Sequence, residues 1–205
     1  DYLDDQAKDK LIMGIQEAAH WLLNMVENLL SITRIQNDND GEAAHVKKTP
    51  EPLEEVVSSA VIRFQKRYPE GKVNVKVPKE FLMVPMDPTL IEQVIMNLLE
   101  NAWIHSGKHE EIDFYARQEG RNVVFYVKDY GDGIEPERME HLFDGCAGSK
   151  DNESRKGMGI GLTICKTIIQ AHQGEIHARN HENGAEFYFS LPLEEENGGM
   201  SNDGV

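Results

Sequence analysis

Apolar residues recur through the first 36 positions with the spacing of a long amphipathic helix. This spacing predicts one helix from about Asp4 to Gln36. Because a wide apolar face on so long a helix needs partner helices, the pattern favours a bundle or coiled-coil element. The alternative is a helix that folds against its own domain. The stripe contains Leu11, Ile15, Ala18, Leu22, Met25, Leu29 and Ile32, and it is widened by Ile12, Ala19 and Val26.

The helical pattern ends in a segment rich in turn-forming residues, NDNDGEAAHVKKTPEP, which starts at Asn37. Asn, Asp, Gly and Pro break regular structure. We therefore place a domain boundary at about Asn37 to Gly41, with one unit over residues 1–40 and a second over residues 41–193. Residues 194–205 are acidic and rich in glycine, and we expect this tail to be disordered.

The second unit mixes helical and strand periods. Because helices alternate with hairpins, we expect an α+β fold, namely a two-layer α/β sandwich with one helical layer on a mainly antiparallel sheet. Helical spacing predicts helices over residues 53–67, 88–106 and 158–172, and alternation predicts strands over residues 73–77, 111–118, 122–128, 175–180 and 185–191.

The composition limits the classes of partner. The 205 residues include 36 acidic and 21 basic side chains, which give a formal net charge of −15. This sign is wrong for neutralising phosphate backbones or anionic lipid, so we expect neither nucleic acid nor a membrane surface as a partner. No apolar run approaches the roughly 18 residues of a membrane span, so we expect this piece not to be embedded in a membrane.

The cysteines and the first residues indicate the compartment. Cys146 and Cys165 form no CxxC pair, and the chain starts with the polar sequence DYLDDQAKDK. Both features favour a reducing cytosol over a secretory route. Because Asp1 stands where a methionine is usual, we expect a piece of a longer protein.

Asn97 and Asn101, in NLLENAWIHSG, lie four residues apart and therefore on one face of the predicted helix over residues 88–106. A carboxamide oxygen is a hard neutral ligand that suits a magnesium ion sharing its shell with phosphates and water. The alternative is a pair of exposed or capping asparagines, which is the commoner role of asparagine in helices.

The sequence DYGDGI, residues 129–134, directly follows a predicted strand. Gly131 and Gly133 allow a tight turn close to a flat ligand, and the Asp129 carboxylate can accept a hydrogen bond from an exocyclic amine such as that of adenine. The alternative is an ordinary turn. A calcium loop fits badly, since Gly131 stands where an oxygen ligand is expected.

A second glycine motif, GMGIGL, leads straight into an apolar helix. Gly157, Gly159 and Gly161 leave backbone amides at the helix start, where the helix dipole favours an anion such as phosphate. The motif is neither a Walker loop nor the dinucleotide GxGxxG, and a glycine-rich hinge is the alternative.

A polar segment lies between the two glycine motifs and carries Phe143, Lys150, Arg155 and Lys156. The segment runs from about Glu135 to Lys156 without periodicity. A segment of this length predicts a lid that closes over the ligand when the phosphates attract its cationic side chains. A plain surface loop is the alternative.

Together these motifs resemble the ATP-binding catalytic domain of sensor histidine kinases, in the superfamily shared with DNA gyrase, Hsp90 and MutL. NLLENAWIHS is similar to the N box, DYGDGI to the G1 box, LFDGCAG to the F box and GMGIGL to the G2 box. The resemblance covers roughly residues 45–192 and implies the Bergerat ATP-binding fold. The first helix resembles the second helix of the dimerisation and phosphotransfer hairpin, and ENLLSITRIQ and ICKTIIQAHQGEI resemble KdpD-type potassium sensors.

The resemblance implies ATP and Mg²⁺ as cofactors and assigns roles to particular residues. Asn101 would be the direct magnesium ligand, supported by Asn97, and Asp129 would bind the adenine amino group. Gly131, Gly133 and Ile134 would shape the base pocket, His105 would lie against the nucleotide, the phosphates would meet Gly157, Met158, Gly159, Ile160, Gly161 and Leu162, and Lys150 and Lys156 would approach from the lid.

The chain also departs from the family pattern. Ile104 stands where a phosphate-contacting lysine is usual, and Cys146 and Gly148 replace an F-box phenylalanine and arginine. Loss of such cations can slow phosphate transfer. No string resembling the HELRTPL acceptor box is present, and we interpret His20 as a bundle residue. We therefore expect no catalytic residue in this fragment and no autophosphorylation by it alone, with the acceptor histidine upstream.

These expectations define the leading hypothesis and its rivals. The chain would be the cytoplasmic catalytic portion of a dimeric membrane sensor kinase that passes phosphate through a histidine to a response regulator in potassium or osmotic signalling. One rival is a degenerate nucleotide-sensing module without transfer. Another is an ATPase of the gyrase or Hsp90 kind, which is disfavoured because those enzymes place a glutamate base where Asn97 stands.

Overall fold

The structure is a computed structural model, and it describes residues 46–106, 111–144 and 160–194, together with scattered helical residues between positions 7 and 30. Every described residue between positions 7 and 30 is helical, as the predicted first helix requires. The apolar side chains described there, such as Leu11, Ile15 and Leu22, are more than half exposed. The assignment of this helix to a bundle with partner helices stays a prediction.

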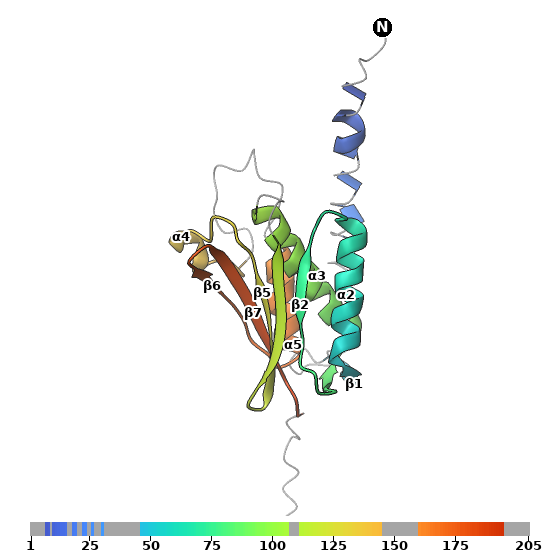
Figure 1. Ribbon diagram of the computed structural model, residues 1–205, viewed down its shortest axis with the longest axis vertical. Helices are drawn as coiled ribbons and strands as arrows, with labels where there is room; N and C mark the ends of the chain where they lie inside the picture. Colours follow the sequence, from blue (N-terminus) through green and yellow to red (C-terminus); the bar gives the residue numbers. More distant parts are fainter. Residues whose placement is uncertain are drawn as a thin grey trace, which may run out of the picture.

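A five-stranded sheet forms one layer of the main domain (Figure 1). Its order is β2-β4-β5-β7-β6, with β2 parallel to β4 and the other neighbours antiparallel. The strands are β2 (Val73–Lys76), β4 (Ile112–Glu119), β5 (Asn122–Lys128), β6 (Ile176–His181) and β7 (Gly184–Pro192). The mainly antiparallel sheet predicted from alternation is confirmed.

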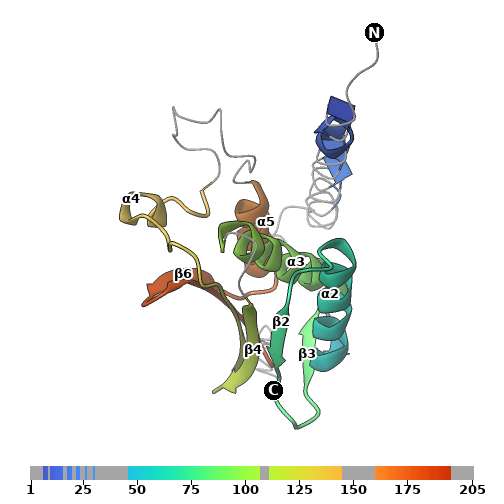
Figure 2. The same cartoon turned by 45° about the horizontal axis from the view of Figure 1, so that its top comes forward.

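Three helices cover one face of this sheet, as Figure 2 shows. They are α2 (Leu53–Arg67), α3 (Pro88–His105) and α5 (Ile160–Ala171). Asp87 caps the N-terminus of α3, where its Oδ1 accepts a hydrogen bond from the backbone N–H of Leu90 at 3.1 Å, and Pro88 occupies the first turn. The two-layer α/β sandwich is therefore the architecture of the described chain.

The hydrophobic core lies between the two layers. Alternate residues of the strands point toward the helices because successive side chains of a strand face opposite sides. Phe114, Phe125 and Phe189 are almost fully buried there, and the rings of Phe125 and Phe189 stack with their centroids 4.5 Å apart. The helices contribute stripes such as Ile91, Val94 and Ile95.

Helices α3 and α5 lie antiparallel. The backbone N–H of Asp87, at the start of α3, donates to His172, directly after the end of α5. Near the middle of α3, Asn97 contacts Cys165 of α5. The first turn of α5 therefore lies beside the C-terminal half of α3.

A second sheet of two short strands was not predicted. Strand β1 (Thr49–Pro52) pairs antiparallel with β3 (Met83–Met86), directly before α2 and α3 respectively. A short helix, α4 (Pro136–Met139), lies within the segment interpreted as a polar lid, and the rest of that segment beyond Asp144 is outside the described residues.

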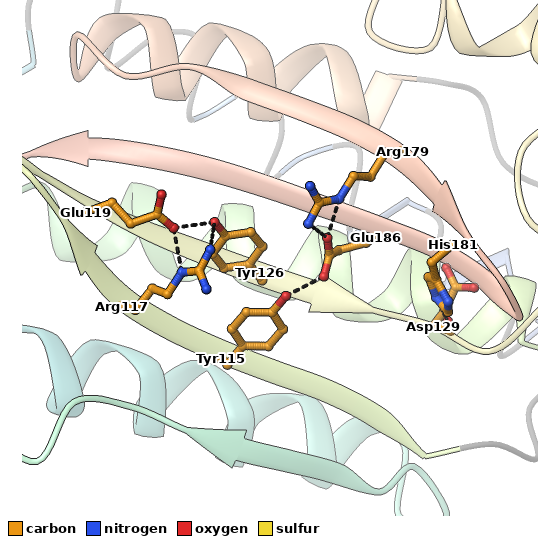
Figure 3. A network of polar contacts seen from close by, with 8 residues as sticks. All are labelled: Tyr115, Arg117, Glu119, Tyr126, Asp129, Arg179, His181 and Glu186. Atoms are coloured by element: carbon orange, nitrogen blue, oxygen red, sulfur yellow. Dashed lines mark hydrogen bonds and ion pairs between the residues drawn. The ribbon is translucent and has the colours of Figure 1, made fainter.

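The face of the large sheet that carries no helix is covered by polar and aromatic side chains (Figure 3). The rings of Tyr115 and Tyr126 stack at 4.5 Å, and the buried Glu186 carboxylate accepts hydrogen bonds from Tyr115 and Arg179. Burial, followed by the Glu186 carboxylate, raises the pKa of Tyr115. Among the described helices, none is both long and apolar enough to cross a membrane.

Candidate functional site

Asn97 and Asn101 lie one turn apart on α3 and are both half-buried. The amide nitrogen of Asn97 donates to the thiol sulfur of Cys165 at 3.7 Å, and the carboxamide oxygen has no hydrogen-bond partner among the described residues. Burial raises the pKa of Cys165 to about 12, which keeps the sulfur a neutral acceptor. Sequence analysis did not select Cys165, since it lies in an apolar helix 68 residues from Asn97.

The carboxamide of Asn101 makes no hydrogen bond with any residue that the structure describes. Two half-buried carboxamide oxygens on one helix face are a donor set that fits a magnesium ion with waters and phosphate oxygens in its remaining positions. Asn101 as the direct ligand and Asn97 as its support remain predictions.

Asp129 stands at the start of the loop after β5 and is only 2% exposed. Its Oδ1 accepts hydrogen bonds from the backbone N–H groups of Gly131 and Ala185, both at 3.0 Å. Within the described part of the chain, Oδ2 has no partner. A buried carboxylate with one fixed oxygen and one available oxygen is an acceptor for an amine donor, as the sequence predicts for adenine.

Gly131 brings this loop against the end of α3. A Cβ atom at Gly131 would lie 2.9 Å from the carbonyl carbon of His105 and closer still to its oxygen, so only glycine fits. His105 therefore lies beside the loop through its backbone, and its side chain is exposed. The predicted contact between the His105 ring and a nucleotide stays a prediction.

The loop ends at Ile134, which is partly buried against the core. Gly133 has a φ of +78°, a left-handed conformation that favours glycine. The side chain of Asn180, from β6, makes two hydrogen bonds to the backbone of Ile134, at 2.8 and 2.7 Å. The next residue, His181, contacts the Asp129 carbonyl oxygen through Nε2 at 2.8 Å (Figure 3).

Neither Asn180 nor His181 was selected from the sequence. Asn180 lies 46 residues from its partner Ile134, and His181 lies 52 residues from its partner Asp129. The sequence pattern of their strand predicts only a hairpin with the strand that follows. The one available signal was the hairpin turn that follows them, which gives no information about the opposite loop.

The first turn of α5 completes the group of predicted residues. A Cβ atom at Gly161 would lie 3.9 Å from Cγ of Asn97, so this turn lies directly over the carboxamide. Leu162 packs against the core, and α5 begins at Ile160. The unpaired N–H groups of a helix start attract anions.

Several predicted residues lie outside the described part of the chain, namely Lys150, Lys156, Gly157, Met158 and Gly159. Arg155, Cys146 and Gly148, which bear on the lid and the altered F box, lie there too. Ile104, in the position where a cation was expected, is 47% exposed on α3.

A hollow of about 840 Å³ lies elsewhere on the molecule. It is lined by the segment 77–82 and by Asp113, Tyr115 and Lys128 of the sheet, and none of the predicted site residues lines it. The selected residues that the structure describes lie instead along the C-terminal half of α3, which the loop after β5 meets at Gly131 and the start of α5 meets at Gly161.

Comparison with known proteins gives a family match over most of the sandwich. Residues 86–195 match the family model described as Histidine kinase-, DNA gyrase B-, and HSP90-like ATPase. The matched range includes both asparagines, both glycine motifs and the strand that carries Asn180.

Two curated relatives are similar over most of this chain. The sensor protein KdpD of Clostridium acetobutylicum is 43% identical over 195 residues, which are 94% of this chain and 21% of the relative. The sensor protein KdpD of Escherichia coli is 36% identical over 169 residues, which are 82% of this chain and 18% of the relative. The chain thus spans about a fifth of the length of these relatives.

Among solved structures, the catalytic domain of the histidine kinase ThkA, in a nucleotide-free form, resembles this chain with a TM-score of 0.63. The two are 29% identical, and the match covers 72% of this chain and 97% of that domain. The similarity agrees with the two-layer architecture and extends over nearly the whole solved domain.

Proposed function

This chain belongs to the family of histidine kinase-, DNA gyrase B- and HSP90-like ATPases, and from this membership we propose that it acts as the ATP-binding catalytic part of a two-component sensor histidine kinase. The observation that carries the proposal is the Asp129 carboxylate, whose Oδ1 accepts two backbone hydrogen bonds and whose Oδ2 has no partner among the described residues, in a loop that meets the end of α3 at Gly131. Such an acceptor beside carboxamides and a helix start suits one ligand, a metal-bridged adenine nucleotide.

Asp129 would select the base. Its carboxylate can only accept hydrogen bonds, so it favours the adenine amino group over the guanine carbonyl oxygen. The two backbone donors on Oδ1 hold the carboxylate in one orientation, which reduces the ordering that binding requires.

The phosphates would lie between the start of α5 and α3. The helix N–H groups near Gly161 would stabilise negative charge, and Asn97, whose carboxamide lies beside Gly161, would contribute its oxygen together with Asn101. A magnesium ion held by these asparagines would neutralise charge on the triphosphate. The chain itself contributes mainly orientation, which supplies most of the rate in phosphate transfer.

We further propose that the acceptor histidine lies on a part of the parent protein outside this sequence. From there phosphate would pass to a response regulator, and the first helix would form a homodimer. The similarity to KdpD supports potassium or osmotic signalling and a parent protein in the membrane, with this part in the cytoplasm.

The rival functions receive less support. The comparisons do not favour a degenerate nucleotide-sensing module, because the chain resembles the catalytic domain of a histidine kinase over almost all of that domain. An ATPase of the gyrase or Hsp90 kind would need a general base where Asn97 stands, and a carboxamide cannot accept a proton at neutral pH.

Nucleotide selectivity tests the base pocket. Asp129→Asn should lower the preference for ATP over GTP by about 10- to 100-fold, since a hydrogen bond to a charged group is worth about 1.5–3 kcal/mol. Competition binding measures both affinities. The matched control is Asp132→Asn, an exposed aspartate in the same loop, which should retain the preference. Unchanged selectivity in Asp129→Asn would refute the base assignment.

Two further measurements test the phosphate side and the transfer. Calorimetric titration of Asn101→Ala should show a smaller effect of Mg²⁺ on ATP affinity than the unaltered chain shows.

For transfer, an acceptor hairpin helix supplied in trans with labelled ATP should yield acid-labile phosphohistidine. ATP binding without any label on the acceptor would favour the sensing module instead.

A further inference from the structure

The side chain of Asn180 makes the two backbone hydrogen bonds with Ile134 that a neighbouring strand would make. Its Oδ1 accepts from the Ile134 backbone N–H at 2.8 Å, and its Nδ2 donates to the Ile134 carbonyl oxygen at 2.7 Å. One carboxamide thus satisfies both backbone groups of the residue that ends the loop over residues 129–134. These groups have no ladder partner there, because β5 ends at Lys128.

The loop approaches Asn180 at a glycine. A Cβ atom at Gly133 would lie 3.1 Å from Oδ1 of Asn180, which is tighter than most real Cβ contacts. With its φ of +78°, Gly133 turns the chain so that Ile134 meets the carboxamide. The turn and the side chain therefore fit as a unit.

The neighbouring residue of β6 holds the other end of the loop. Nε2 of His181 donates to the Asp129 carbonyl oxygen at 2.8 Å, while Nδ1 accepts from the Asn183 backbone N–H at 3.3 Å, which requires the Nε2–H tautomer. The His181 ring also meets Tyr130 edge-on, with centroids 5.8 Å apart. Figure 3 shows His181 beside Asp129.

We infer that Asn180 is a positioning residue for nucleotide base recognition: by fixing Ile134, it holds the loop over residues 129–134 in the shape that places Asp129 and Ile134 around the base. The inference rests on the proposed function. Asn180 acts through the loop, so its contribution concerns only the part of the affinity that comes from the base. Because the loop is already held in its binding shape, less free energy is lost in ordering the loop when the ligand binds.

Binding of two probes to the full 205-residue chain tests this role. The first is ATP and the second is inorganic tripolyphosphate, which carries the phosphates without a base, both with Mg²⁺ in excess. Asn180→Ala should raise the Kd for ATP by about 3- to 30-fold, as the loss of two hydrogen bonds predicts. It should leave the Kd for tripolyphosphate within twofold.

Two more variants complete the design. Asn122→Ala makes the same change at an exposed asparagine at the opposite end of the sheet, beside Pro192, and should alter neither Kd. If Asn180→Ala does not fold, Asn180→Asp keeps the shape and the acceptor but loses the donor to the Ile134 carbonyl. Asn180→Asp should likewise raise the Kd for ATP and leave the Kd for tripolyphosphate unchanged.

The outcomes separate this inference from the proposed function. Asn180 variants that change the ATP Kd less than threefold, or that weaken both probes equally, would overturn the positioning role and leave the proposed function intact. An unaltered chain that binds ATP no more tightly than tripolyphosphate would overturn both.

Discussion

His172 lies completely buried where the end of α5 meets the start of α3. Its Nδ1 donates to the Ile168 carbonyl oxygen at 2.7 Å, and its Nε2 accepts from the Asp87 backbone N–H at 3.0 Å. Both ring nitrogens are used by the neutral form only, since a protonated ring cannot accept. Burial, the largest effect, lowers the pKa of His172 below its ordinary value.

The free energy of unfolding should therefore fall in mild acid. The unfolded chain binds the His172 proton more tightly than the folded chain does. The contribution of His172 to the free energy of unfolding is therefore fully present above the unfolded pKa of about 6.5 and declines as the pH falls below it. Urea unfolding at pH 7.5, 6.5 and 5.5 measures the decline. His172→Gln should flatten it over this interval.

An exposed histidine provides the control. His177, on β6, contacts Glu175 at the surface, and His177→Gln should leave the decline unchanged. Equal slopes for the unaltered chain and His172→Gln would contradict the assignment of the decline to His172.

Residue types and short spacings were enough to predict the groups that present chemistry to a ligand. Asn97, Asn101 and Asp129 stand in local motifs, and their assignment to one site stays a prediction. Cys165, which contacts Asn97, and Asn180, which contacts Ile134, were missed because each acts on a partner far along the chain. A long-range contact made by a common polar residue leaves no periodic signal in one sequence.

Helices α2 and α3 are joined by an ion pair between Arg67 and Glu100, with the nearest atoms 2.7 Å apart. Glu100 lies in α3 between the two asparagines and is 8% exposed. The Arg67 guanidinium also lies over the ring of Tyr68, which in turn packs near Trp103. The contact therefore anchors the site-bearing helix to its neighbour.

Removal of the cation should destabilise the domain. Arg67→Met leaves the Glu100 carboxylate in a poorly solvated position without this partner, and we expect the free energy of unfolding to fall by about 2–4 kcal/mol. Denaturant unfolding measures the change. Lys66→Met, one residue away and exposed, should alter it by less than about 0.5 kcal/mol. A similar small change in both variants would contradict the role of the ion pair.

At the scale of elements, strongly periodic segments were predicted and the short strands β1 and β3 were not. Strands β1 and β3 have four residues each, and they contain Pro50, Pro52 and Pro85, which lack the N–H that a strand ladder uses. Such segments form a sheet only because the folded chain places them side by side. Local sequence therefore does not favour them.

The whole molecule carries a net charge of −15 on 205 residues, and repulsion among these charges opposes the compact state. Salt screens this repulsion, with a Debye length near 10 Å at about 0.1 M. We expect the melting temperature to rise by several degrees between low salt and about 0.3 M salt.

Two salts with different cations separate screening from specific binding. Sodium chloride and tetramethylammonium chloride at equal ionic strength should give the same rise, because screening depends on charge alone. A melting temperature that stays constant or falls with both salts would contradict a role for net repulsion in limiting stability.

The antiparallel arrangement of α3 and α5 separates the place where the chain enters the domain from the place where the predicted site residues gather. Lys48, just before β1, donates to Gln173 beyond the end of α5, near the start of α3. At roughly 1.5 Å per residue, Asn101 lies about 20 Å farther along α3 from Pro88. A displacement of β1 would therefore reach Asn101 only through a movement that α3 carries along this length.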